Sequence, residues 1–111
     1  MIFVTGPLFA GKRDYVRAAL GWTEVELARR AIWDVQEQAG AAADLEALAE
    51  RLAQYEVVIA TEVGGGVVPV DAGQRADREA AGRLACLLAQ RADAVVRVCC
   101  GLPQLLKGEW P

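Results

Sequence analysis

Short apolar segments alternate with amphipathic segments along the whole chain. Four runs rich in β-branched and other apolar residues have the length of buried strands: residues 1–5, 31–35, 56–61 and 94–99. Between them, apolar positions recur three and four residues apart, which predicts helices over residues 13–20, 23–30, 45–52 and 75–91. The run 31–35 also fits the end of the preceding helix, although its apolar content favours a strand. Strands alternating with helices predict a parallel sheet of about four strands with right-handed crossovers.

Capping residues support these helix boundaries. Thr23 and Glu26 have the identity and spacing of a capping box, and Asp44 stands directly before the helix expected over 45–52. In the longest helix, the buried face is expected at Ala80, Leu84, Leu87 and Leu88.

The segments between these elements are expected to be irregular. Residues 62–73 are rich in glycine and predict a long loop, and residues 101–111 predict a mostly irregular tail with a turn at Pro103. In parallel α/β sheets, ligands bind beyond the carboxyl ends of the strands. Residues 6–12, 34–37, 61–66 and 100–101 follow expected strands and are therefore the candidate site segments.

Length, charge and composition narrow the classes of protein. The chain of 111 residues suits one α/β domain over residues 1–111, and its net charge of −3 does not suit a protein that coats nucleic acid. The absence of histidine removes imidazole metal sites and any histidine base, and the three cysteines contain no CxxC pair. Without a long apolar run we expect no membrane span and no signal peptide, and therefore a cytoplasmic protein.

The segment from Gly6 to Lys12 matches the phosphate-loop motif G-x-x-x-x-G-K, directly after an expected strand and before an expected helix. We call residues 6–12 the phosphate loop. Its backbone N–H groups and the following helix N-terminus would bind phosphate oxygens, and Lys12 would neutralise the outer phosphates of ATP or GTP. The alternative is a simple strand-to-helix turn with a surface lysine. The candidate nucleotide-binding residues are Gly6, Pro7, Leu8, Phe9, Ala10, Gly11, Lys12 and Arg13.

The residue after the motif departs from the usual pattern. Arg13 stands where a Ser or Thr hydroxyl normally binds Mg²⁺, and a guanidinium cannot coordinate a cation, although it could lie near a phosphate. Asp34, near the end of the second expected strand, is placed like the acidic residue that holds Mg²⁺ in phosphate-loop enzymes; it could equally be an ordinary strand-end aspartate. Glu62 suits a metal-linked carboxylate or a base, or a loop carboxylate that caps N–H groups.

Two further blocks carry a family pattern. Residues 61–69 are Thr-Glu-Val-Gly-Gly-Gly-Val-Val-Pro, and residues 100–103 are Cys-Gly-Leu-Pro, with Lys107 after them. Between these blocks, the expected long helix carries Arg75, Arg78, Gly82 and Arg83. Together with the phosphate loop, this order of blocks resembles the adenosylcobinamide kinase / adenosylcobinamide-phosphate guanylyltransferase family (CobU-like). That family has Asn where this chain has Thr61, and Asp where it has Glu79.

The resemblance implies a P-loop NTPase-like three-layer α/β fold with a small, mostly parallel sheet. It also implies ATP- or GTP-dependent phosphorylation of the cobinamide aminopropanol hydroxyl, followed by guanylyl transfer through a histidine. This chain has no histidine, and the family is substantially longer, so the resemblance is to a shortened member with kinase-like chemistry alone. Mg²⁺ would be the metal, in spite of Arg13.

Site residues follow from the resemblance and from the strand ends together. The candidate catalytic residues are Lys12, Asp34 and Glu62, with Asp34 as the metal ligand. Gly64 to Gly66 would let the backbone approach a substrate or would form a turn, and the helix arginines would contact phosphate or corrin amides or form a solvated face. The candidate substrate-binding residues are Thr61, Gly64, Gly65, Gly66, Arg75, Arg78 and Arg83.

Other functions stay open beside the kinase. The chain could be a non-catalytic nucleotide- or cobamide-binding module, which Arg13 and the missing histidine favour, or an assembly partner of a full-length enzyme. The expected partners are a nucleoside triphosphate and a small corrinoid, without nucleic acid or membrane. Because so small a domain buries limited surface, we also expect a homo-oligomer.

Overall fold

The computed structural model describes residues 1–63 and 71–111. Gly64, Gly65 and Gly66, which were expected to meet the substrate, lie outside the described residues. The strands are β1 (Ile2–Gly6), β2 (Ala31–Ile32), β3 (Val57–Thr61), β4 (Ala94–Cys99) and β5 (Leu102–Lys107). The helices are α1 (Lys12–Leu20), α2 (Glu24–Arg30), the short 3₁₀ helix η1 (Val35–Gln38), α3 (Leu45–Leu52) and α4 (Ala72–Arg91).

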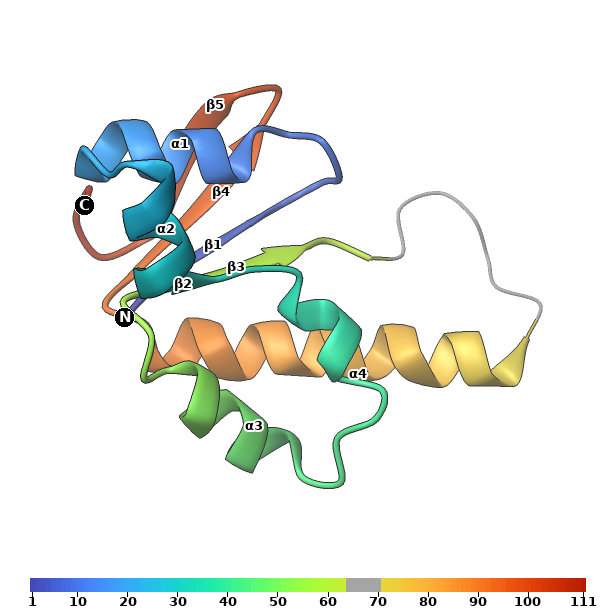
Figure 1. Cartoon of the computed structure of the whole chain (residues 1–111). Coiled ribbons are helices and arrows are strands. Elements are labelled where there is room, and N and C mark those ends of the chain that lie inside the picture. Colours follow the sequence, from blue (N-terminus) through green and yellow to red (C-terminus); the bar gives the residue numbers. More distant parts are fainter. Residues whose placement is uncertain (64–70) are drawn as a thin grey trace.

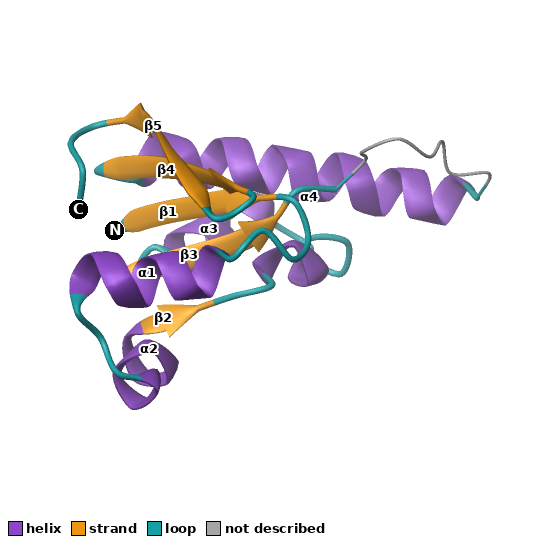
Figure 2. Cartoon of the chain, turned by 90° about the horizontal axis from the view of Figure 1, so that it is seen from above, coloured by secondary structure: helices purple, strands orange, loops and turns teal. Residues whose placement is uncertain are grey.

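The five strands form one sheet with the order β2-β3-β1-β4-β5. β1 lies at its centre and pairs in parallel with β3 and β4, and β2 pairs in parallel with β3. Helices α1 and α2 cover one face of the sheet, while α3, η1 and α4 cover the other (Figures 1 and 2). The predicted three-layer α/β fold with a mostly parallel sheet is therefore confirmed.

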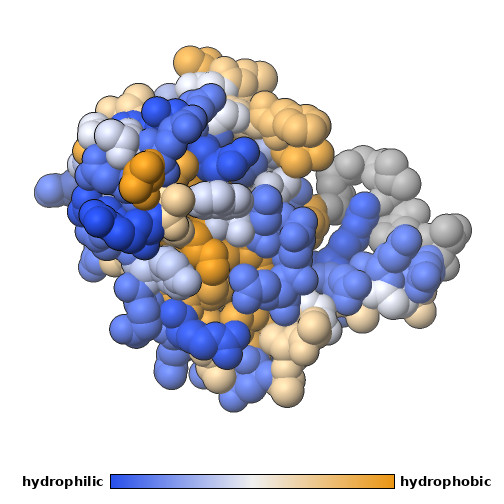
Figure 3. Space-filling model, in the orientation of Figure 1, coloured by the Kyte–Doolittle hydropathy of each residue, from blue (hydrophilic) through white to orange (hydrophobic). Residues whose placement is uncertain are grey.

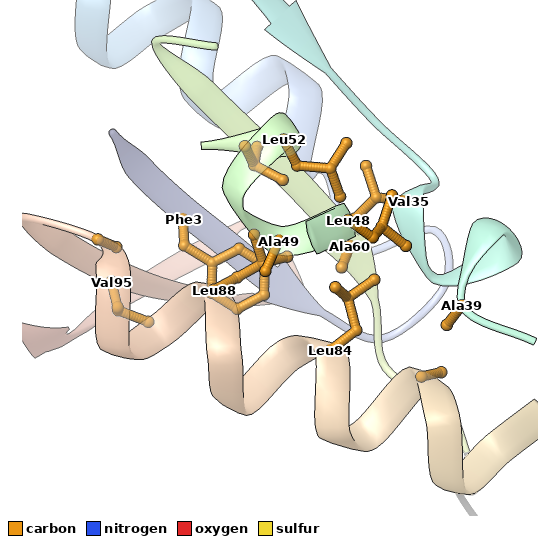
Figure 4. Packing of buried hydrophobic residues seen from close by; sticks show 13 residues of the cluster. Phe3, Val35, Ala39, Leu48, Ala49, Leu52, Ala60, Leu84, Leu88 and Val95 are labelled. Atoms are coloured by element: carbon orange, nitrogen blue, oxygen red, sulfur yellow. The ribbon is translucent and has the colours of Figure 1, made fainter. Parts of the chain in front are cut away.

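Alternation along the central strands divides the core between the two faces. Phe3 of β1 and Val58 of β3 point into a cluster with α3, η1 and α4, and Figure 4 shows Leu84 and Leu88 of α4 in that cluster. The neighbouring Val4 packs instead into a second cluster with α1 and α2. Because successive strand side chains point to opposite faces, one apolar run supplies both clusters.

Local sequence signals set several boundaries as predicted. Thr23 and Glu26 form both hydrogen bonds of the capping box at α2, and the Asp44 carboxylate accepts two N–H groups at the start of α3. The run 31–35 is a strand only at Ala31–Ile32; Val35 is fully buried and begins η1. In α4 the buried residues are Ala81, Leu84 and Leu88, so the expected Leu84 and Leu88 are confirmed while Ala80 and Leu87 are only half-buried.

The prediction of an irregular tail was wrong. Residues Leu102–Lys107 form β5, which pairs antiparallel with β4 at the edge of the sheet. Cys100 and Gly101 both have positive φ, 54° and 74°, which is the geometry that joins two antiparallel strands tightly. Pro103 is tolerated because an edge strand does not need every N–H for pairing.

The phosphate loop lies at the carboxyl ends of the parallel strands, and the two chain termini lie at the opposite end of the strands (Figure 1). Helix α4 extends past the carboxyl ends of the strands. In the part of the chain that the structure describes, no helix is both long enough and apolar enough to cross a membrane.

Candidate functional site

The phosphate loop leaves the end of β1 through backbone conformations that favour glycine. Gly6 has φ of 155°, and a Cβ there would lie 2.1 Å from the carbonyl oxygen of Val98 on the neighbouring strand. Phe9 and Gly11 also have positive φ, at 58° and 85°. Leu8 and Phe9 project outward, with Phe9 95% exposed, and hydrophobic side chains gather at this edge in Figure 3. Gly6 is therefore required for both the turn and the close strand approach.

Lys12 is folded back into the loop and is only 8% exposed. Its Nζ donates hydrogen bonds to the carbonyl oxygens of Gly6 at 3.2 Å and Pro7 at 2.6 Å. Burial lowers the pKa of the Lys12 ammonium, and the charge of Arg13 adds to that lowering, while the carboxylates of Asp34 and Glu62 oppose it. Lys12 is therefore a desolvated cation whose hydrogen bonds go to neutral carbonyl oxygens.

The turn between β4 and β5 supports the loop from the other side. The N–H of Gly101 donates to the carbonyl oxygen of Ala10 at 2.8 Å. A Cβ on Gly11 would lie 3.6 Å from the Cα of Gly101, so the two backbones are in close contact. The segment 100–101 was expected at the site because it follows a strand. The structure adds that it holds the loop in place.

A cleft of roughly 690 Å³ opens beside the loop, between α1, α2 and the ends of β2 and β3. It brings together eight predicted site residues from three parts of the sequence: residues 8–13, Asp34 and Thr61. Its other charged lining residues are Asp14, Arg17 and Glu24, and its apolar floor includes Leu27, Trp33 and Ile59.

Asp34 and Thr61 reach the cleft through local backbone features. Asp34 is exposed and has φ of 57°, an uncommon conformation for a residue other than glycine. The N–H of Thr61 donates to the side-chain oxygen of Gln36 at 2.9 Å, which ties β3 to η1. Gln36 was not predicted from the sequence, because only the folded pairing of two distant segments places it there.

Glu62 is held by a residue that the sequence analysis did not predict. Arg97 of β4 donates from Nε and from an Nη nitrogen to the two carboxylate oxygens, at 2.6 and 2.9 Å, so the pair is bidentate. This contact lowers the pKa of Glu62. The N–H of Glu62 also donates to the carbonyl oxygen of Gly6 at 2.8 Å. An arginine within an otherwise apolar strand was the available signal for this pair.

The three arginines expected to contact the substrate lie on α4. Arg75 and Arg83 are exposed, and Arg78 is half-buried. Helix α4 covers the face of the sheet opposite α1, and none of the three arginines lines the cleft. The structure therefore groups the phosphate loop with Asp34 and Thr61, but does not add the α4 arginines to that group.

Few side chains at the site suit a divalent cation. Mg²⁺ prefers about six oxygen ligands, and Arg13 offers none. Of the two candidate carboxylates, Glu62 is paired with Arg97, while Asp34 has no cation within ion-pair distance in the described segments. Among the residues that the structure describes, no three His, Cys, Asp or Glu side chains group closely enough to hold a metal. The described side chains thus offer Mg²⁺ at most one carboxylate that no described cation engages, a poorer donor set than the hydroxyl and carboxylate of the usual phosphate-loop site.

One comparison with known proteins bears on this site. The family model for cobinamide kinase / cobinamide phosphate guanyltransferase (CobU) matches residues 16–106. The match covers most of the chain and begins shortly after the phosphate loop. None of the curated proteins matches the chain significantly.

Proposed function

Because the chain belongs to the cobinamide kinase / cobinamide phosphate guanyltransferase family, we propose that it is a nucleotide-dependent, cobinamide kinase-like protein. Family membership implies a role in cobamide biosynthesis and chemistry that involves a nucleotide. The proposal is narrower: the γ-phosphoryl group of ATP or GTP passes to the aminopropanol hydroxyl of adenosylcobinamide. Guanylyl transfer through a histidine is not part of the proposal, because the chain has no histidine.

One observation carries this proposal. The lysine of the phosphate loop lines the same cleft as the carboxylate of Asp34, and the carboxylate charge acts on the Lys12 ammonium. Phosphoryl transfer needs mainly positioning and charge neutralisation. Lys12 and the loop N–H groups would hold the outer phosphates, and Asp34 would face the acceptor hydroxyl at the mouth of the cleft.

The proposed step balances without a covalent protein intermediate. The hydroxyl oxygen attacks the γ-phosphorus in line, the bond to the bridging oxygen breaks, and the nucleoside diphosphate leaves. The hydroxyl proton passes to Asp34, which, unlike Glu62, forms no ion pair with any residue that the structure describes. Glu62 does not line the cleft. Its backbone N–H is bonded to the first residue of the phosphate loop, Gly6, and its carboxylate is oriented by Arg97.

We propose that the acceptor substrate contacts Thr61, the glycine block and the α4 arginines. Thr61 lines the cleft and would meet the acceptor arm. The block Gly64 to Gly66 and the α4 arginines Arg75, Arg78 and Arg83 would meet the larger corrin amides outside the cleft. Association with a second copy of the chain also remains a proposal.

A second candidate is a non-catalytic module that binds a nucleotide or a cobamide. The bidentate pair between Glu62 and Arg97 favours it, because a carboxylate engaged in such a pair is a weak base and a poor metal ligand. This candidate shares the phosphate loop with the kinase and differs only in turnover.

Isotope transfer separates the two candidates. The protein is incubated with adenosylcobinamide and ATP or GTP labelled at the γ- or the α-phosphate. Transfer from the γ-position alone supports the kinase, whereas transfer from the α-position contradicts the histidine argument. Retained nucleotide binding without any transfer supports the non-catalytic module.

Carboxylate variants locate the chemistry in the same assay. We expect Asp34→Asn and Glu62→Gln each to abolish transfer while leaving nucleotide affinity nearly intact, because neither residue is proposed to hold the phosphates. Glu46→Gln is the matched control, since Glu46 is an exposed carboxylate on α3, away from the cleft. Full activity of Asp34→Asn would remove Asp34 from the proposed step.

A further inference from the structure

The guanidinium of Arg13 is held in place by an aromatic ring. Its central carbon lies 5.2 Å from the centre of the Trp33 ring, within the range of a cation–π contact. Trp33 is half-buried and packs against the apolar cluster under α1 and α2, so the ring is itself fixed. In the described segments, no carboxylate lies within ion-pair distance of Arg13. The side chain is therefore oriented by packing, and its hydrogen-bond donors have no anionic partner.

Arg13 is one of three cations that line the cleft, which is also lined by the carboxylates of Asp14, Glu24 and Asp34. Arg17 lies one helical turn further along, on the same side of the helix, and both line the cleft beside Lys12. Arg17 has only a long contact of 3.4 Å with Glu24, and its buried Nε has no hydrogen-bond partner among the described residues. Among the described residues, Arg13 thus has no ion pair, Arg17 is paired with Glu24 at 3.4 Å, and Lys12 is bonded to carbonyl oxygens.

The charges around Lys12 are mixed: the carboxylates of Asp34 and Glu62 favour its charged form, and Arg13 opposes it more weakly. The charge of Arg13 is close enough to Lys12 to help lower the pKa of its ammonium. Like charges at this separation destabilise each other, and a polyanion between them reverses that cost. A nucleoside triphosphate without a bound metal is the more highly charged form and would gain most.

The same residues form a poor magnesium site. The position after the loop lysine carries a cation in place of a hydroxyl, and one of the two nearby carboxylates is engaged by Arg97. The guanidinium of Arg13 on α1 would therefore lie where a metal ion would otherwise neutralise the phosphates.

We propose that Arg13, held on Trp33, neutralises the outer phosphates of the nucleotide in place of a protein-bound Mg²⁺. The chain then binds metal-free nucleoside triphosphate at least as tightly as the magnesium complex. Trp33 is a positioning residue, because it acts through Arg13. This inference rests on the proposed function, since it needs a nucleotide in the phosphate loop.

The test is calorimetric titration of ATP and GTP into the full chain, once in excess EDTA and once in excess Mg²⁺. The wild type is expected to bind in EDTA with an affinity equal to or higher than that in Mg²⁺. Arg13→Ser removes a charge-assisted contact and restores a hydroxyl, so it is expected to lose about tenfold in affinity in EDTA and to regain affinity when Mg²⁺ is added. Arg29→Ser is the control, because Arg29 is an exposed arginine on α2 outside the cleft.

A second pair of variants tests the role of the ring. Trp33→Phe keeps an aromatic face and is expected to retain the EDTA affinity, whereas Trp33→Leu is expected to lose part of it. Circular dichroism and thermal unfolding establish that each variant is folded. Equal EDTA affinity of the wild type and Arg13→Ser, or a wild type that binds only with Mg²⁺, would overturn the inference.

Comparing Lys12→Ala with Arg13→Ser separates the role of Arg13 from nucleotide binding itself. A loss of affinity in Lys12→Ala without one in Arg13→Ser overturns the role of Arg13 and leaves the nucleotide site in place. An absence of nucleotide binding by the wild type under both conditions overturns both.

Discussion

The two faces of the sheet are built for different purposes. On the face covered by α3, η1 and α4, 13 of the described residues form a buried hydrophobic cluster between the helices and the sheet (Figure 4). On the face covered by α1 and α2, the buried cluster holds eight residues, and charged side chains line the cleft beside it. One face therefore supplies more of the apolar burial that stabilises the fold, while the other carries a cleft lined by charged side chains of both signs.

The largest expected effect breaks the first face alone. Leu88 is fully buried in the cluster with α4, so Leu88→Ala should lower the free energy of unfolding by about 2–5 kcal/mol. Urea denaturation measures this loss, and Leu106→Ala, at a side chain 53% exposed on β5, is the control with little effect. The folded fraction should bind nucleotide as the wild type does. A loss of nucleotide affinity beyond the unfolded fraction would contradict the division between the faces.

The next effect breaks the second face without the first. Lys12→Ala removes the loop cation, and the loss of a charge-assisted contact of about 1.5–3 kcal/mol corresponds to tenfold weaker triphosphate binding or more. Thermal unfolding without nucleotide should change little, because the buried ammonium has only carbonyl partners. Unchanged affinity in calorimetric titration would show that the loop is only a turn.

A smaller effect tests how firmly α2 bounds the cleft. Thr23→Ala removes the hydroxyl of the capping box and should lower stability by about 1 kcal/mol. Thr23→Ser keeps the cap and is the matched control. Helix α2 contributes Glu24 and Leu27 to the lining of the cleft. In Thr23→Ala we therefore expect a lower midpoint of urea denaturation and a smaller increase of that midpoint when nucleotide is added. Equal stability of Thr23→Ala and the wild type would show that the capping box does not stabilise α2.

The smallest effect concerns acidic pH. Contact with Arg97 lowers the pKa of Glu62 in the folded protein, so its contribution to stability is present above the ordinary carboxyl pKa near ~4.3 and is lost as the pH falls through the lowered value. The pair is partly exposed and should contribute at most about 1 kcal/mol. The stability difference between wild type and Glu62→Gln, measured by urea denaturation, should shrink from pH 7 to pH 3. A constant difference would contradict the ion pair.

Local patterns predicted the features that depend on neighbouring residues. The strand-to-helix turn at residues 6–12, the capping box at Thr23 and the alternating strands and helices each follow from a few consecutive positions, and each appears in the structure. The site could be predicted as far as Lys12, Asp34 and Thr61, since strand ends in a parallel sheet meet at one edge.

Features that depend on distant pairing could not be predicted in this way. β5 was missed because Leu102–Lys107 contains a proline and becomes a strand only by pairing with β4. Arg97 and Gln36 were missed because each finds its partner 35 or 25 residues away, across strands whose order the local pattern does not specify. The contact between Arg13 and Trp33 likewise joins two segments 20 residues apart, α1 and the chain that follows β2.

The central claim is that the phosphate loop and its cleft bind a nucleoside triphosphate, while the opposite face only stabilises the fold. Titration of the ¹⁵N-labelled chain with ATP, followed by amide and indole chemical shifts, tests it most directly. We expect the N–H groups of residues 9–12 and the indole of Trp33 to shift, and the amides of α3 and the C-terminal half of α4 to stay nearly unchanged. Shifts confined to α3 and α4, or unchanged signals of residues 9–12 at saturating ATP, would contradict the claim.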